Sequence, residues 1–149
     1  MGFKKLLNDY SNITLEFYGN GTEYEEVKSL AKDNPNIELH GSYDNTSITN
    51  FLNRDSDILV LPYRDISISN IGSPTKLFEY MSMGLPLLVS NVGQLNNIIS
   101  DMENGFIYQA GDINSFYRKL KYIIEQPDVA VKVANRAYED FINHHTWQA

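Results

Sequence analysis

The stretch that decides the fold spans residues 72–90 and reads GSPTKLFEYMSMGLPLLVS. Ser73 is a good helix N-cap, because its hydroxyl can accept a hydrogen bond from an unpaired backbone N–H. Pro74 suits the first helical position, where its missing N–H costs nothing. Gly84 can adopt the left-handed conformation that ends a helix, and an apolar run begins at Pro86. The stretch therefore predicts a helix over residues 74–82 followed by a buried strand over 86–90.

The start of this helix is a candidate anion site. Its unpaired N–H groups and the positive end of its dipole lie at residues 73–76, and both favour a phosphate or diphosphate. Lys76 lies where a capping box would place Glu or Gln, which fits if an anion binds beside it. Glu79 lies a little over one turn further on, among mostly apolar neighbours, where its carboxylate could accept hydrogen bonds from a polyol such as ribose.

Apolar runs alternate with helical patterns along the whole chain. Strand–helix alternation at this spacing predicts parallel strands joined by crossover helices. Thr22 with Glu25 predicts a capping box, and Asp112 predicts an N-cap. The expected helices cover residues 2–9, 22–32, 44–54, 74–82, 94–99, 112–125 and 128–143, and the expected strands cover 13–18, 37–40, 57–62, 86–90 and 105–109.

The stretch 72–90, together with Asn91-Val92-Gly93 and Asn104-Gly105, resembles the C-terminal, nucleotide-sugar-binding half of the GT-B retaining glycosyltransferases of family 4. The resemblance runs from about Gly2 to Trp147. It implies a Rossmann-like three-layer α/β/α domain with a mainly parallel sheet over residues 1–149. It also implies a fragment of a longer two-domain enzyme, whose donor would be a nucleoside diphosphate sugar, most simply a UDP-sugar, and whose other domain binds the acceptor.

The family's binding half begins with a central strand, an Arg and a Lys that this sequence does not contain ahead of its first helix. We expect either that the strands at 13–18 and 57–62 pair directly, or that another chain fills the gap, as in a dimer through the incomplete sheet. On either view, we expect the isolated fragment to be inactive as a transferase.

The resemblance assigns donor-binding roles to nine residues and leaves the fragment without a catalytic residue. Glu79 would accept the ribose hydroxyls, and the start of the helix would hold the diphosphate. Many members of the family have a second Glu that contacts the donor sugar. This sequence has Ile71 at that position, so the identity of the donor sugar is left open. Simple turn, cap or surface roles remain alternatives for most of these positions. The assigned residues are Glu79, Ser73, Thr75, Lys76, Pro74, Gly19, Gly21, Tyr43 and Arg64.

The composition of the chain limits the kinds of ligand and partner that it is expected to bind. The net charge of −7 argues against nucleic-acid binding through a broad basic surface. The chain has no Cys, and no His, Asp or Glu group has metal-ligand spacing along the sequence, so we expect no metal or other cofactor. The apolar runs are too short to cross a bilayer. We expect a cytoplasmic protein that can act at the inner membrane face, and His144 and His145 are expected to be solvated.

Two classes of function follow. By resemblance, the enzyme would transfer a hexose to a glycan or lipid-linked glycan in bacterial surface polysaccharide synthesis, such as capsule assembly. The alternative is a non-catalytic Rossmann-like or flavodoxin-like binding module. A receiver-type module needs an acidic pair at its strand ends, whereas Gly19-Asn20 and Tyr63 stand there.

Overall fold

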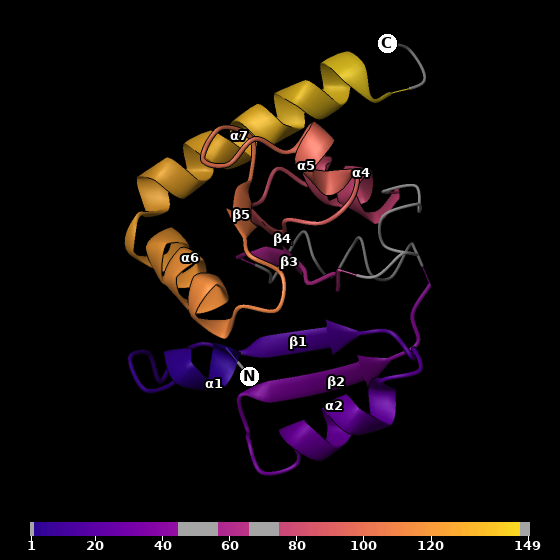
Figure 1. Cartoon of the computed structure of the whole chain (residues 1–149), viewed down its shortest axis with the longest axis vertical. Coiled ribbons are helices and arrows are strands. Elements are labelled where there is room, and N and C mark those ends of the chain that lie inside the picture. Colours follow the sequence, from indigo (N-terminus) through magenta and orange to yellow (C-terminus); the bar gives the residue numbers. More distant parts are fainter. Residues whose placement is uncertain (1, 45–56, 66–74, 147–149) are drawn as a thin grey trace. The chain divides into compact units, whose positions relative to one another are not determined.

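The structure, a computed structural model, describes residues 2–44, 57–65 and 75–146. These residues form an α/β chain whose paired strands are all parallel, as predicted. Contacts within the chain divide it into two compact units, residues 3–54 and residues 55–149. Each unit has its own strands and helices (Figure 1).

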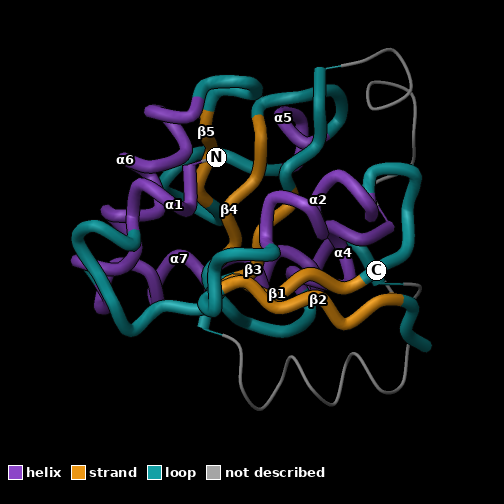
Figure 2. The backbone as a smooth tube through the Cα atoms, turned by 90° about the horizontal axis from the view of Figure 1, so that it is seen from below, coloured by secondary structure: helices purple, strands orange, loops and turns teal. Residues whose placement is uncertain are grey.

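The first unit is built on two parallel strands, β1 (Leu15–Tyr18) and β2 (Ile37–Gly41). They run side by side (Figure 2), and α2 (Tyr24–Ala31) packs against β2. Because side chains alternate along a strand, Leu15, Phe17 and Leu39 pack around Ile37, together with Phe3 of α1 (Gly2–Leu6). The other face of the strand pair consequently carries polar and aromatic side chains.

The second unit contains a sheet in the order β3 (Leu59–Leu61), β4 (Leu87–Ser90) and β5 (Phe106–Tyr108). All four residues of the central strand β4 are buried, as expected for a parallel strand covered on both faces. The helix α6 (Ile113–Glu125) packs against β5, and α7 (Pro127–His144) packs against both α6 and α4 (Thr75–Met81). The short helix α5 (Leu95–Ile98) precedes β5 (Figures 1 and 2).

The local signals were mostly read correctly. Gly84 has φ of 66° and ends α4 as predicted. Asp112 caps α6, accepting hydrogen bonds from the amides of Asn114 at 2.8 Å and Ser115 at 3.0 Å. The predicted capping box at Thr22 is wrong, because α2 begins one residue later than that box requires, and Glu23 at the N-cap makes no side-chain capping hydrogen bond. The predicted helix over 44–54 lies outside the described residues.

The two sheets remain separate within the described part of the chain. There, β1 is hydrogen-bonded to β2, and β3 to β4. Direct pairing of the strands predicted at 13–18 and 57–62 is therefore not found. The other expectation, that a strand from outside these elements completes the sheet, stays a prediction.

Candidate functional site

The helix α4 brings three of the predicted donor-binding residues together. Thr75, Lys76 and Glu79 lie on its first two turns. The Lys76 ammonium contacts the Glu79 Oε2 at 2.6 Å, as expected for side chains three residues apart on a helix. The side chains are 27% and 39% exposed, respectively. The pair therefore forms a charged, half-exposed edge of α4.

This ion pair changes the interpretation of Lys76. A cation near a helix N-terminus opposes the helix dipole, and the sequence offered a bound anion as the compensation. In the structure, the Glu79 carboxylate supplies a compensating charge. The same contact provides the Glu79 carboxylate, whose neighbours on α4 are mostly apolar, with a charged partner. A carboxylate has about four lone-pair sites, so one bond through Oε2 leaves Glu79 able to accept hydroxyl donors as well.

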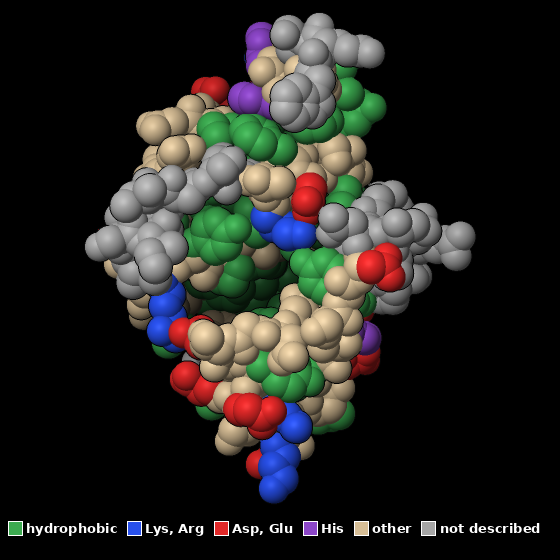
Figure 3. All heavy atoms as spheres, turned by 90° about the vertical axis from the view of Figure 1, so that its right-hand side faces the viewer, with side chains coloured by type: hydrophobic (Ala, Val, Ile, Leu, Met, Phe, Trp, Pro, Cys, Tyr) green, Lys and Arg blue, Asp and Glu red, His purple; other side chains and the backbone are tan. Residues whose placement is uncertain are grey.

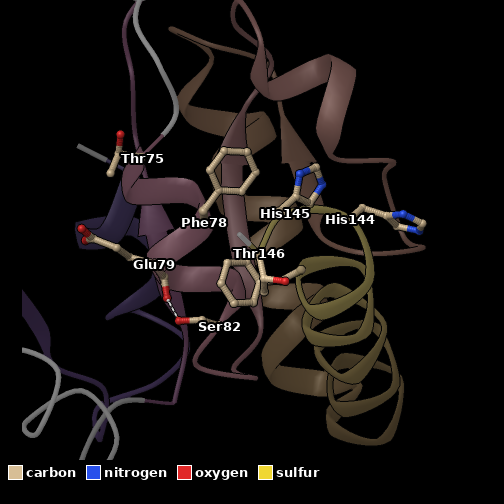
Figure 4. A pocket seen from close by; sticks show the side chains of 8 residues that line it. Thr75, Phe78, Glu79, Ser82, His144, His145 and Thr146 are labelled. Atoms are coloured by element: carbon tan, nitrogen blue, oxygen red, sulfur yellow. Dashed lines mark hydrogen bonds between the residues drawn. The ribbon is translucent and has the colours of Figure 1, made fainter. Parts of the chain in front are cut away.

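An open groove of about 620 Å³ lies between α4 and the C-terminal end of α7. Its apolar side includes Phe78, against which the His145 ring is tilted with a centroid separation of 4.6 Å. The Glu79 carboxylate points away from these rings (Figure 4). The groove is lined by Thr75, Phe78, Glu79, Ser82, Phe141, His144, His145 and Thr146.

The α7 side of this groove was missed by the sequence analysis. His144 and His145 are exposed, as predicted, but His145 also contacts Phe78. The two residues are far apart along the chain, and nothing in either local sequence indicates the contact. Only the packing of α7 against α4 brings them together.

The remaining predicted residues lie elsewhere. Ser73 and Pro74 fall outside the described residues. Arg64 is exposed just after β3. Gly19, Gly21 and Tyr43 belong to the first unit. Gly19 has φ of 137° and donates its amide to the Gly41 carbonyl at 2.7 Å, so this residue continues the hydrogen bonding between the parallel strands just past β1, in a conformation that favours glycine.

The first unit also holds a polar cluster that the sequence analysis did not predict. Glu16 and Glu38 are register partners on β1 and β2, and His40 lies two residues beyond Glu38. Tyr18 stacks on His40, and Tyr43 lies edge-on to Tyr18 at 6.1 Å. The members come from two strands, so their spacing along the sequence gave no metal-ligand signal.

Asn91 and Asn104, which begin the segments Asn91-Val92-Gly93 and Asn104-Gly105 of the family resemblance, both have hydrogen-bond partners within the protein. Asn91 accepts the Ala110 amide through Oδ1 at 2.8 Å and donates to the Gln109 side chain, which ties the end of β4 to the residues after β5. Asn104 is buried and bonds to Ile98, Ser100 and Asp140. These hydrogen bonds connect neighbouring segments of the second unit and give both asparagines a structural role that needs no ligand.

Charged side chains of both signs are visible among the described residues on the face drawn in Figure 3. There, Lys and Arg side chains lie next to Asp and Glu side chains. Among the described helices, none is long and apolar enough to cross a membrane.

The chain belongs to the glycosyl transferases group 1 family, whose model matches residues 2–126. An uncharacterized glycosyltransferase of Haemophilus influenzae is 25% identical over 136 residues, which is 89% of this chain and 36% of that protein. The chain thus spans about a third of that relative.

Solved structures share the fold. The C-terminal domain of a glycosyl transferase group 1 family protein, LpcC of Francisella tularensis, matches with a TM-score of 0.79 and 20% identity over 99% of this chain and 77% of that one. Anabaena Alr3699/HepE in complex with UDP-glucose matches with a TM-score of 0.74 and 16% identity over 93% of this chain and 38% of that one. These likenesses confirm the GT-B, Rossmann-like fold.

Proposed function

We propose that this chain binds the nucleoside diphosphate sugar donor of a retaining glycosyltransferase. The observation that best supports this proposal is the Lys76–Glu79 ion pair on α4, found in a chain that belongs to the glycosyl transferases group 1 family. The pair presents a carboxylate for hydroxyl groups and an ammonium for phosphate oxygens within one helical turn. A ribose joined to a diphosphate carries both kinds of partner side by side: hydroxyl groups for the Glu79 carboxylate and phosphate oxygens for the Lys76 ammonium.

Different residues would contact different parts of the donor. Glu79 accepts the ribose hydroxyls, and Thr75 and Lys76, with Ser73 and Pro74 just before them in the sequence, contact the diphosphate. As the sugar leaves, negative charge grows on the diphosphate, and fixed donors aimed at it lower the barrier. The remaining contribution of the protein is positioning. We assign no step to a metal, and the donor roles of Gly19, Gly21, Tyr43 and Arg64 stay predictions.

UDP is the nucleotide that we favour, because HepE, which shares the fold, was crystallised with UDP-glucose. Since the chain spans 36% of its Haemophilus influenzae relative, we propose that another domain binds the acceptor and that this chain alone does not transfer sugar. The family resemblance favours a glycan or lipid-linked acceptor in bacterial surface polysaccharide synthesis, on the cytoplasmic face of the membrane.

An amide-resolved NMR titration with UDP, GDP, ADP and uridine tests the proposal. We expect saturable shifts on α4, with UDP binding tightest. Glu79→Gln removes a charged acceptor and should weaken both UDP and uridine about tenfold. Lys76→Gln should weaken UDP but leave uridine nearly unchanged, because uridine carries no phosphate.

Glu139→Gln, an exposed carboxylate on α7, is the matched control and should change neither affinity. Equal UDP affinity in wild type and Glu79→Gln would refute the assignment of the ribose contact. Absence of shifts with all nucleotides would favour the non-catalytic binding module, provided that a longer chain carrying the acceptor domain also fails to bind.

A further inference from the structure

The polar face of the β1–β2 pair places two carboxylates and an imidazole together. Glu16 lies directly opposite Glu38 in the register of the parallel strands. Like charges at such positions destabilise a sheet unless a positive charge lies between them. His40 extends from β2 on the same face, because side chains two residues apart on a strand share a face. The side-chain ligand atoms of these residues all lie within 4.8 Å of one another.

The separations match the edges of a metal coordination sphere. His40 Nε2 lies 3.1 Å from Glu16 Oε2 and 3.6 Å from Glu38 Oε2. Two ligands bound tetrahedrally at about 2.1 Å from a zinc ion are about 3.4 Å apart. The observed separations fall on either side of this value. The two separations that involve His40 therefore need shifts of only a few tenths of an ångström, and the carboxylate oxygens of Glu16 and Glu38, which lie within 4.8 Å of each other, would move together around the ion.

Aromatic side chains around the cluster hold its ligands in place. Tyr18 donates its hydroxyl to Glu16 Oε2 at 2.6 Å. The same tyrosine ring is stacked on the His40 imidazole, with centroids 4.5 Å apart and planes inclined by 8°. Tyr43 in turn packs edge-on against Tyr18. Partners of this kind orient metal ligands, and their loss commonly weakens metal binding by about 10–100-fold.

We propose that Glu16, Glu38 and His40 bind one divalent transition-metal ion, with Zn²⁺ as the best match. One imidazole nitrogen and two carboxylate oxygens form a ligand set that zinc accepts, with water completing four-coordination. Magnesium prefers an all-oxygen octahedron and keeps several waters, so it should not compete. The ion would neutralise the two facing carboxylates. Its role is to stabilise the end of the β1–β2 pair, and it is separate from sugar transfer.

The charge and exposure of the cluster set its affinity. The chain carries a net charge of −7, which attracts cations in general. The His40 and Glu16 side chains are 34% and 27% exposed, whereas Glu38 is 55% exposed. We therefore expect His40 and Glu16 to determine the affinity, and Glu38 to contribute less because water competes for the ion at that position.

Calorimetric titration of Zn²⁺ into the untagged chain, with a parallel titration of Mg²⁺, tests the proposal. We expect about one zinc per chain and no heat from magnesium. His40→Gln should abolish the strong site, and Glu16→Gln should weaken it. Tyr18→Phe should weaken zinc binding about tenfold while keeping all three ligands. His145→Gln, which removes an exposed imidazole in the other unit, should leave the titration unchanged.

Imidazole and amide NMR shifts supply the second readout. Zinc should shift the His40 ring signals and the amides of β1 and β2 before those of His144 and His145. Circular dichroism of each variant shows whether it remains folded, and Glu38→Gln provides a second ligand variant at the most exposed position. Zinc binding that is equally strong in wild type, His40→Gln and Glu16→Gln, or absent from wild type, would overturn the proposal.

Discussion

Replacing Asn104 by Ala should be among the most damaging changes to a polar residue of the second unit. Asn104 is 8% exposed, and its side chain lies where the end of α5, the turn before β5 and α7 meet. Its Oδ1 accepts the Ser100 amide at 2.7 Å, and its Nδ2 donates to the Ile98 carbonyl at 3.0 Å and to Asp140 Oδ2 at 2.8 Å. Alanine removes all three bonds.

The magnitude follows from the kinds of bond that are lost. The two bonds to backbone groups are neutral and contribute about 1 kcal/mol each, whereas the bond to the Asp140 carboxylate contributes about 1.5–3 kcal/mol. Asp140 keeps its contact with Arg136 at 3.2 Å, which offsets part of the loss. We therefore expect the free energy of unfolding to fall by about 3 kcal/mol.

Urea denaturation followed by circular dichroism measures this change. With a slope of about 2 kcal/mol per molar urea, the midpoint should fall by roughly 1.5 M. A double-mutant cycle with Asp140→Ala should show a coupling of about 1–2 kcal/mol. Asn97→Ala, an exposed asparagine on α5, is the control. If Asn104→Ala costs no more than Asn97→Ala, the three bonds do not hold α5 and α7 together and the reasoning fails.

Two further changes test a helix cap and a buried phenol. Asp112→Ala removes the cap of α6 and should cost about 1 kcal/mol in urea denaturation, whereas Glu139→Ala on the exposed side of α7 should cost much less; equal losses would contradict the cap. Burial raises the pKa of Tyr108 above 10.0, partly offset by its hydrogen bond with Ser90. Above about pH 10, the unfolded chain therefore binds fewer protons at this residue than the folded chain does. The contribution of the phenol to the free energy of unfolding is complete below that pH and is lost as the pH rises through the folded-state pKa. Tyr108→Phe should lessen the fall in melting temperature between pH 9 and 11, and the exposed Tyr138→Phe should not; identical pH profiles for both variants would refute the assignment.

The fold was predictable from local signals that leave few alternatives. Continuous apolar residues in β4 require a strand that is covered on both faces, and Gly84 ends α4 through a backbone conformation that other residues rarely adopt. The start of α2 was misread because Thr22 and Glu25 have the spacing of a capping box. That spacing is only one condition, and the helix in fact begins at Tyr24.

The candidate site was predicted residue by residue but not as a set of contacts. Glu79 and Lys76 were each assigned to a ligand, although their spacing of three residues on a helix also predicts the ion pair that the structure contains. The contact between Phe78 and His145 depends on the packing of α7. The meeting of Glu16 with Glu38 depends on strand register. Hydrophobic pattern predicts that strands exist, but it does not by itself fix which residues face each other.

The helix α4 separates the residues that stabilise it from those that would bind a ligand. Leu77 and Met81, which are 0% and 1% exposed, anchor one side of the helix in the core. Lys76 and Glu79 lie on a more exposed side, where an ion pair contributes only about 0.3–0.5 kcal/mol because water and salt screen it. Replacing Glu79 should therefore hardly change folding stability, and a loss of nucleotide binding in Glu79→Gln would report on the site itself. The same separation explains why Glu79, although it adds little stability, is the most informative position for testing the function.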